Sequence, residues 1–296
     1  MRTGILGHPD GGYVRLLTET AARLGYRTEI LRFEELAANV RDGALQIRSG
    51  SSRVDQFDAM IVRTMPPGSL EQVVSRMDLL CSLEAQGVLV VNPPKALECA
   101  VDKSLTTLRL AKVGIAVPDT IICETFEQAM DAWEELGGDV LVKPLFGSEG
   151  RGIVRVTEEE LAVRVFRTLT RIGSVLYLQR FLKTSAGDIR ILLLDGQLIG
   201  AIRRIPTAGE FRANLACSGA AVLHQPTDRE LQLAMRAADA TGSVFAGVDL
   251  MYDAANRPVV IEVNAVPGWK GLQQVCGIDV AEIFLCWLAK QVETSM

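Results

Sequence analysis

The sequence predicts an α/β protein made of α+β lobes, and three observations lead to this class. Apolar strands alternate with helices over the first 95 residues, two strands flank a glycine-rich turn at residues 146–152, and the last third of the chain is rich in strands. Of the 296 residues, 48% are hydrophobic and 23% are charged. The chain is therefore long enough for two compact lobes or one large domain.

The first lobe begins with an apolar strand at residues 4–7, followed by a helix with apolar residues at helical spacing. A strand at residues 59–62, a helix at 70–86 and a strand at 88–91 continue the alternation and predict a small parallel sheet. Residues 43–54 are polar and turn-rich, and they suggest no chemistry.

The middle of the chain predicts three helices, the last two of which start with capping boxes, Thr125-x-x-Gln128 and Thr157-x-x-Glu160. These helices span residues 104–113, 125–136 and 158–172. Strands at 140–144 and 153–156 flank the glycine-rich turn, which we expect to be a mobile hairpin loop. The remaining predicted elements are a hairpin across Asp195 and Gly196, a helix at 227–241, a hairpin at 248–263 and a helix at 278–292.

Composition excludes several classes of function. The formal net charge is −5 and the pI is about 5.3, so we expect no nucleic-acid partner and no membrane surface. No apolar run approaches the roughly 20 residues that span a bilayer, and the first residues turn polar too early for a secretory signal, which favours a cytoplasmic protein. The six cysteines form no Cys-x-x-Cys pair, and His8 and His224 are the only histidines. Reduced thiols are expected, and a zinc site or a Ser-His-Asp triad is not.

The last hairpin carries three oxygen ligands. If its turn lies at Ala255 and Asn256, Asp249 faces Glu262 across the strands, and Asn264 shares a face with Glu262 two residues away. Carboxylate and amide oxygens suit Mg²⁺, with phosphate oxygens and water completing the site. Solvent-facing polar residues are the alternative, but the neighbouring Val, Ile and Leu residues indicate a buried strand, where unpaired carboxylates are costly.

Lys143 lies near the end of an apolar strand, just before the glycine-rich turn, where a lysine is unusual for a core. We interpret it as a point charge for nucleotide phosphates, with loop amides closing over the same phosphates. The loop residues concerned are Gly147, Ser148, Gly150 and Gly152. A glycine-rich turn alone is more often a plain hairpin, and neither the Walker nor the dinucleotide pattern fits, because this turn joins two strands.

A set of motifs in order along the chain resembles the RimK-type alpha-L-glutamate ligases of the ATP-grasp superfamily. The motifs are Val101-Asp-Lys103, Val142-Lys143-Pro144, Tyr177-Leu-Gln179-Arg-Phe181, Gly187-Asp188-Ile-Arg190, Glu210-Phe-Arg212-Ala-Asn214, Ala246-Gly-Val-Asp249 and Glu262-Val-Asn264-Ala-Val-Pro-Gly268. The resemblance covers about residues 90–285 and implies an ATP-grasp fold with an N-terminal pre-ATP-grasp lobe that holds the parallel sheet. The implied domains are a substrate lobe at residues 1–95, a small lid subdomain at 96–180 and a C-terminal subdomain with the magnesium site at 181–296.

The resemblance also implies a role for each motif residue. It places Lys103 and Lys143 on the phosphates of ATP, and Asp249, Glu262 and Asn264 on two Mg²⁺ ions, for which Mn²⁺ could substitute. The nucleotide base and ribose are expected at Gln179, Arg180, Phe181 and Asp188. The terminal phosphates and an acidic substrate are expected at Arg212, Asn214, Arg203 and Arg204.

The implied activity is that of an ATP-dependent carboxylate–amine ligase that forms ADP and an acyl phosphate, with L-glutamate as the incoming amine. The acceptor carboxylate would belong to a protein C-terminus or to a small cofactor such as tetrahydromethanopterin, and the acidic chain favours the cofactor. Two alternatives stay open: a non-catalytic ATP-binding protein, because the loop after Asn214 departs from the family pattern, and a carrier-protein ligase of lysine biosynthesis. A homo-oligomer is compatible with the sequence.

Overall fold

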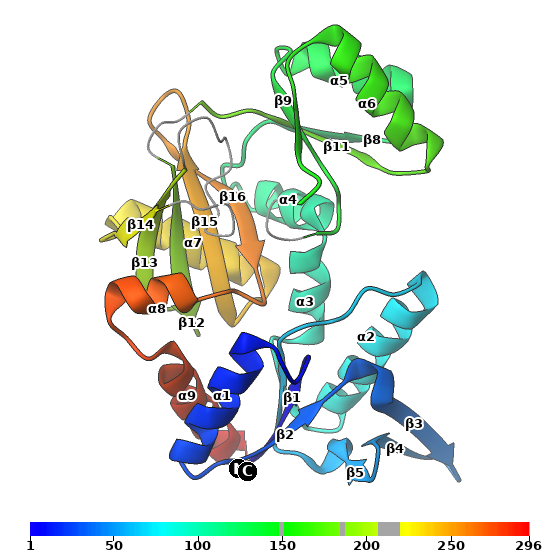
Figure 1. Cartoon of the computed structure of the whole chain (residues 1–296), viewed down its shortest axis with the longest axis vertical. Helices are drawn as coiled ribbons and strands as arrows, with labels where there is room; N and C mark the ends of the chain where they lie inside the picture. Colours follow the sequence, from blue (N-terminus) through cyan, green and yellow to red (C-terminus); the bar gives the residue numbers. More distant parts are fainter. Residues whose placement is uncertain (148–150, 184–186, 207–219, 296) are drawn as a thin grey trace. The chain divides into compact units, whose positions relative to one another are not determined.

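The computed structural model describes residues 1–147, 151–183, 187–206 and 220–295. The chain forms two compact units (Figure 1). Unit 1 comprises residues 1–98, 242–245 and 265–296, and unit 2 comprises residues 99–241 and 246–264. The division into lobes at residues 95 and 180 stays a prediction, but the segment that follows residue 264 belongs with the first 98 residues.

Unit 1 is built on a four-stranded parallel sheet of order β2-β1-β6-β7, which confirms the predicted parallel sheet. Its strands are β1 (Arg2–Leu6), β2 (Arg27–Leu31), β6 (Ala59–Val62) and β7 (Leu89–Val91). Its helices are α1 (Gly12–Arg23), α2 (Leu70–Ala85), α8 (Lys270–Cys276) and α9 (Val280–Ser295), and α3 (Pro94–Val101) leads into unit 2. All four residues of β6 are buried, as expected for a parallel strand covered on both faces.

A small antiparallel sheet occupies the stretch to which the sequence pattern gave no structure. Its strands are β3 (Leu36–Arg41), β4 (Ala44–Ser49) and β5 (Ser52–Arg53). The turn between β3 and β4 consists of Asp42 and Gly43, with φ of 51° and 76°. Two positive φ angles give the turn that matches the twist of paired strands, so the Asp-Gly pair was the sequence signal for this hairpin.

Unit 2 contains two antiparallel sheets. The first has the order β10-β9-β11-β8 and carries α5 and α6; the second has the order β14-β13-β12-β15-β16. Along the chain, the first elements of unit 2 are α4 (Lys103–Lys112), β8 (Thr120–Cys123), α5 (Phe126–Glu135), β9 (Val140–Lys143), β10 (Val154–Val156), α6 (Glu159–Arg171) and β11 (Leu176–Arg180). The elements that follow are β12 (Asp188–Leu194), β13 (Gln197–Ile205), β14 (Ala220–Leu223), α7 (Asp228–Thr241), β15 (Phe245–Tyr252) and β16 (Pro258–Asn264).

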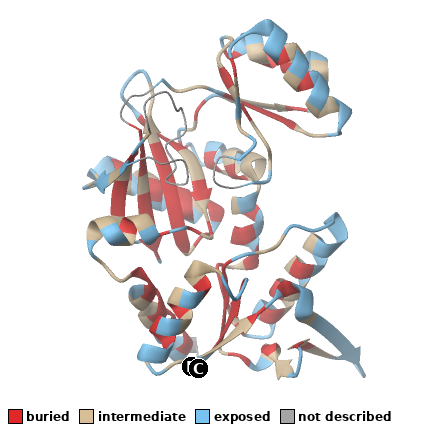
Figure 2. Cartoon of the chain, viewed as in Figure 1, coloured by how far each residue is buried: buried red, intermediate tan, exposed pale blue. Residues whose placement is uncertain are grey.

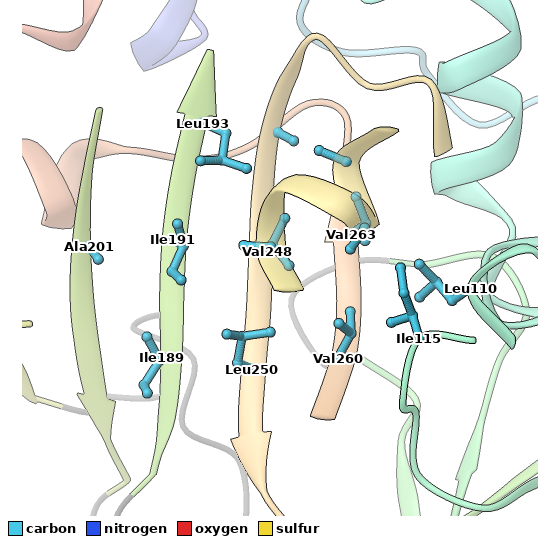
Figure 3. Packing of buried hydrophobic residues seen from close by; sticks show 14 residues of the cluster. Leu110, Ile115, Ile189, Ile191, Leu193, Ala201, Val248, Leu250, Val260 and Val263 are labelled. Atoms are coloured by element: carbon cyan, nitrogen blue, oxygen red, sulfur yellow. The ribbon is translucent and has the colours of Figure 1, made fainter. Parts of the chain in front are cut away.

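The core of the second sheet lies on the face that packs against α7 and the end of α4. Ile189, Ile191, Val248, Leu250 and Val260 project from neighbouring strands into this core (Figure 3). Figure 2 shows that β12 and β15 are buried over most of their length, whereas β14 at the edge of the sheet is largely exposed. Because side chains alternate along a strand, the residues between these apolar positions project to the opposite face, where the polar site lies.

Several details differ from the sequence prediction, among them the unpredicted strands β2 and β8. The Thr125 hydroxyl accepts a hydrogen bond from the Gln128 amide at 3.2 Å, as predicted, but the Thr157 capping box is wrong. The helix α6 begins one residue later, with Glu158 as its N-cap and no side-chain cap. Helices α3 and α8 were not predicted, since both are short or follow proline directly.

Within the described part of the chain, no single helix is long and apolar enough to span a membrane; α8 and α9 would qualify only as a pair bent by 105°. Five of the six cysteines lie in the described part of the chain, and none of these five is in a disulfide: Cys81, Cys99, Cys123, Cys276 and Cys286.

Candidate functional site

The predicted pairing of the last hairpin is confirmed. Asp249 of β15 lies opposite Glu262 of β16, and a bulge follows at once, because Leu250 pairs with Val260. The irregularity keeps Asp249, Glu262 and Asn264 on the polar face of the sheet while Leu250 returns to the core. Two strands with a tight turn therefore bring the three predicted metal ligands to one place.

In the structure, the carboxylate of Asp249 is held by two arginines. Arg190 Nε and Nη2 donate to its two oxygens at 2.6 Å each, and Arg204 Nη2 lies 2.8 Å from Oδ2. Only 2% of Asp249 is exposed. Burial raises the pKa of Asp249, but Arg190 and Arg204 outweigh burial and leave it below the ordinary value.

Asp188 completes this buried cluster from the neighbouring strand. It pairs with Arg204, whose Nε donates at 2.9 Å and whose Nη2 donates to the same oxygen. Burial raises the pKa of Asp188, opposed by the Arg204 guanidinium and supported by the nearby Asp249 charge. Two carboxylates and two guanidiniums thus neutralise one another on the polar face of the sheet. The predicted contact of Asp188 with ribose stays a prediction.

Asn264 lies between Glu262 and Arg190. With its amide nitrogen 3.3 Å from Glu262 Oε1 and its oxygen 3.1 Å from Arg190 Nη2, both ends are satisfied. In the other amide orientation two oxygens would face each other, an arrangement that a cation between them would stabilise. The hard oxygen donors of Glu262 and Asn264 fit a divalent ion, whereas the Asp249 carboxylate is engaged by Arg190 and Arg204 in the structure, and its predicted role as a metal ligand stays a prediction.

Lys143 reaches the site from the first sheet of unit 2. Its Nζ donates to Gln179 Oε1 at 2.6 Å, and Gln179 Nε2 donates to Thr120 at 3.0 Å and to Tyr177 at 3.1 Å. Burial lowers the pKa of Lys143 to about 8, with Glu262 raising it and Lys103 lowering it further. A buried ammonium whose hydrogen-bond partner is a neutral amide is prepared to bind an anionic group.

Lys103 is the first residue of α4, whose N-cap is Asp102; the Asp102 carboxylate accepts from the Leu105 amide at 3.0 Å. The cap fixes the helix start, and Lys103 Nζ donates to the Gly147 carbonyl at 2.8 Å. Burial lowers the pKa of Lys103, and the negative charge of Glu262 opposes the shift. Glu262 thus interacts with both predicted phosphate lysines.

The segment at the end of β11 where the nucleotide base was predicted to bind (the hinge, residues 179–181) uses two of its amides for hydrogen bonds to other residues of unit 2. Arg180 N donates to the Asp119 carbonyl at 2.8 Å and Phe181 N to the Asp139 carbonyl at 3.0 Å. The Arg180 side chain pairs with the Asp119 carboxylate at 2.9 Å. A backbone contact with adenine at this hinge stays a prediction, and it would have to come from groups other than these two amides.

Several predicted residues fall outside the described residues: Ser148, Gly150, Arg212 and Asn214. At the ends of the glycine-rich turn, Gly147 and Gly152 have φ of 149° and 75°, which other residues rarely adopt.

The structure brings in one arginine that the sequence analysis passed over. Arg190 stands two residues after Asp188 on β12 and therefore shares its face; strand alternation was the signal that could have found it. Arg203 pairs across the strands with the core residue Ile189, so its side chain projects to the opposite face from Arg204. Its predicted catalytic role stays untested, whereas Arg204 is the member of this pair that joins the cluster.

The fold combines a parallel-sheet unit with two antiparallel sheets; Lys143 lies on one of these sheets, Lys103 on helix α4, and the carboxylates and arginines on the other sheet. Solved ATP-grasp structures share this fold. The ligase PsnB with minimal precursor, Mg and ADP has a TM-score of 0.75 at 18% identity, covering 98% of each chain. A RimK domain ATP-grasp protein from Sphaerobacter thermophilus has a TM-score of 0.73 at 20% identity, covering 98% of this chain and 100% of that one.

A family model described as RimK-like ATP-grasp domain matches residues 100–288. The tetrahydromethanopterin:alpha-L-glutamate ligase of Methanosarcina acetivorans is 31% identical, over 95% of this chain and 96% of that protein. The ribosomal protein bS6–L-glutamate ligase of Salmonella paratyphi B is 32% identical, over 98% and 96%. The chain belongs to the RimK-like ATP-grasp family, and both the resemblance and the enzyme class predicted from the sequence, an ATP-dependent ligase, are confirmed.

Proposed function

We propose that this chain joins L-glutamate to an acceptor carboxylate, with conversion of ATP to ADP and phosphate. The observation that carries the proposal is the meeting of Lys103, Lys143 and Glu262, which interact electrostatically although they come from three separate elements. Two lysines with lowered pKa values suit phosphate oxygens, and a neighbouring carboxylate suits the metal ion of a nucleotide.

Each group has a part in the proposed reaction. Lys103 and Lys143 would hold the nucleotide phosphates, and Glu262, Asn264 and Asp249 would hold Mg²⁺. The metal would supply charge neutralisation on the phosphates when bound. Arg190 and Arg204, which lie beside Asp249, would add positive charge near the phosphates during phosphoryl transfer. The acceptor carboxylate attacks the terminal phosphorus of ATP, the bond to ADP breaks, and ADP leaves as the acyl phosphate forms. The glutamate amine then attacks the acyl carbon, phosphate leaves, and the nitrogen loses a proton to give the amide.

The acceptor is either a small cofactor or a protein C-terminus. The two relatives act on tetrahydromethanopterin and on ribosomal protein bS6, and they resemble this chain to almost the same degree. A net charge of −5 does not favour binding to a ribosome. We therefore propose that the acceptor is a small cofactor of the tetrahydromethanopterin kind.

Phosphate release tests the proposal. Turnover should require ATP, Mg²⁺, L-glutamate and an acceptor together, and hydroxylamine should intercept the acyl phosphate as a hydroxamate. Lys143→Met should abolish release, whereas Lys112→Met, an exposed lysine at the end of α4, should leave it unchanged. AMP and pyrophosphate as products would refute the mechanism.

A further inference from the structure

Strand β3 of unit 1 is an exposed sheet edge. It pairs with β4 on one side and is the end strand of the order β3-β4-β5. Its last five residues are all exposed, and within unit 1 the β3–β4 hairpin extends away from the parallel sheet (Figure 1). An unpaired edge offers a row of amides and carbonyls to another strand. Exposure alone does not identify that strand.

The edge lacks the features with which sheet edges normally avoid pairing. No charged residue and no proline lies between Leu36 and Arg41, and β3 pairs with β4 without a bulge. Val40 is 72% exposed, whereas Ile47, on the same face of the hairpin, is fully buried. The apolar face of the hairpin therefore continues beyond the part that unit 1 covers, up to the free edge.

The register of the hairpin determines which backbone groups point to the free edge. Arg41 and its partner on β4 flank the two-residue turn, and such a pair exchanges both of its hydrogen bonds. Because the pattern alternates along the strands, Ala38 and Val40 direct their amides and carbonyls outward. The carbonyl of Leu36 also points outward, whereas its amide donates to the Phe33 carbonyl.

A second copy of β3 fits this edge in an antiparallel arrangement. In a symmetric pair of strands, the residues with outward backbone groups must face each other. A pairing centred on Ala38 meets this condition, because Ala38 faces its own copy and Leu36 faces Val40. The Val40 amide can then donate to the Leu36 carbonyl of the other copy. The same pairs continue the apolar face across the twofold axis.

The neighbouring registers are less favourable. A pairing centred on Ala37 would set the charged Glu34 opposite the apolar Val40. A pairing centred on Asn39 would have to include Asp42, which lies in the turn with φ of 51° and is not extended. The register centred on Ala38 is the one that uses the whole strand.

Charges at the ends of β3 select the same register. The pairing centred on Ala38 sets Arg41 opposite Glu35, the last residue before β3, and the twofold axis repeats this pair at the other end. Both side chains are exposed, and within the described residues neither forms an ion pair, whereas Glu34 pairs with Arg32 at 3.6 Å. Opposite charges that face each other across antiparallel strands attract. The strand is thus complementary to itself in backbone, apolar side chains and charge.

We propose that two copies of this chain associate through β3, paired antiparallel and centred on Ala38, so that their β3-β4-β5 sheets join edge to edge. This self-association is independent of the proposed function and uses no residue of the phosphate or metal site. The contact is small, so the dimer should be weak and should dissociate on dilution.

Sedimentation of the full chain over a concentration series tests the contact. The wild-type chain should change from monomer to dimer as its concentration rises. Ala38→Pro should stay monomeric, because proline removes the outward amide, and it should keep the wild-type melting temperature, because that amide makes no hydrogen bond within the hairpin. Arg41→Glu should weaken dimerisation about tenfold, because both end pairs become repulsive. Arg171→Glu, the same charge change on an exposed residue at the end of α6, is the control.

Exchanging the two end charges separates the register from a general effect of charge. Glu35→Arg alone should weaken association as Arg41→Glu does, and the variant with both substitutions should recover wild-type dimerisation. A chain that stays monomeric up to about 1 mM, where even a weak specific dimer forms, would overturn the proposal. Dimerisation that Ala38→Pro leaves unchanged, or charge effects that add instead of cancelling, would overturn it too. An assembly larger than a dimer should split into smaller species with Ala38→Pro, and one that stays whole counts against the contact.

Discussion

Asp249 and Glu262 are both proposed metal ligands, but their surroundings predict that removing their charges affects the stability of the metal-free protein to different extents. Asp249 is buried and accepts hydrogen bonds from Arg190 and Arg204. Glu262 is half-buried and contacts Asn264, and within the described residues it forms no ion pair with an arginine. Asp249→Asn keeps the shape of the side chain while removing its charge, so it isolates the electrostatic contribution.

The expected loss follows from the two guanidiniums that Asp249→Asn leaves behind. Removing one partner of a buried ion pair typically costs about 3–5 kcal/mol, and Asp188 alone cannot compensate both arginines. At about 2–4 °C per kcal/mol, the melting temperature of the metal-free protein should fall by roughly 6–20 °C. Glu262→Gln should change the unfolding free energy by less than about 1 kcal/mol, since its charge is partly solvated.

Thermal melts with and without Mg-ATP measure both effects. Each variant should lose turnover and most of the stabilisation by Mg-ATP, because binding to the folded state is weakened. Only Asp249→Asn should lose metal-free stability. A metal-free Asp249→Asn protein that melts at the wild-type temperature, or a Glu262→Gln protein that melts far below it, would refute the electrostatic reasoning.

Three other perturbations have expected results. Asn92 is 1% exposed; it donates to the Phe245 and Ala265 carbonyls and accepts from the Val244 and Phe245 amides. Asn92→Asp should therefore lower the unfolding free energy at neutral pH, and the loss should shrink as acid protonates the new carboxylate. Denaturant unfolding at two pH values checks this, and a pH-independent loss would contradict it. The pKa of Lys143 is about 8 in the fold against 10.5 unfolded, so its deprotonation should weaken ADP binding as pH rises through 8, while the unfolding free energy of the nucleotide-free protein gains from this group between 8 and 10.5. Calorimetry should show proton uptake on ADP binding near pH 8, and its absence would count against the assignment. Gly187 has φ of 71°, and a Cβ there would overlap the Arg204 carbonyl, whereas a Cβ on Gly196 would meet open space. Gly187→Ala should therefore cost more unfolding free energy than the roughly 1–2 kcal/mol of left-handed strain expected for Gly196→Ala. Equal melting temperatures of the two variants would exclude the close approach.

Local periodicity and turn chemistry were enough to predict how β15 and β16 pair in the last hairpin. The two-residue period of a strand, combined with one turn position, placed Asp249 opposite Glu262, and the structure has this pairing. The same rule distinguishes Arg204 from Arg203, but the sequence analysis did not carry the alternation across β13. Applied from Asp188 along β12, it would also have identified Arg190.

Long-range packing could not be predicted in the same way. The buried side chain of Asn92 fastens residues 242–245 and Ala265 into unit 1, and a single asparagine between a strand and a proline gives no local sign of such a role. Arg63 and Lys270 are likewise separated by more than half of the chain, and each alone reads as an ordinary surface charge. The unusual feature is their common position at the start of α1, which depends on Tyr13 and the loop before α8.

The arginine contacts of Asp249 and its proposed metal role are compatible because they serve different states of one site. Three oxygen ligands gathered on a buried face repel one another unless positive charge is present. In the structure Arg190 provides that charge, since it contacts Asp249 directly and Asn264 through the amide oxygen. A divalent cation would take over both oxygens, and the freed guanidinium would keep its positive charge beside the nucleotide phosphates. Under the proposed metal site, the same arginine would stabilise the fold without metal and face phosphate with it, so the proposed ligands would be stable before a metal binds.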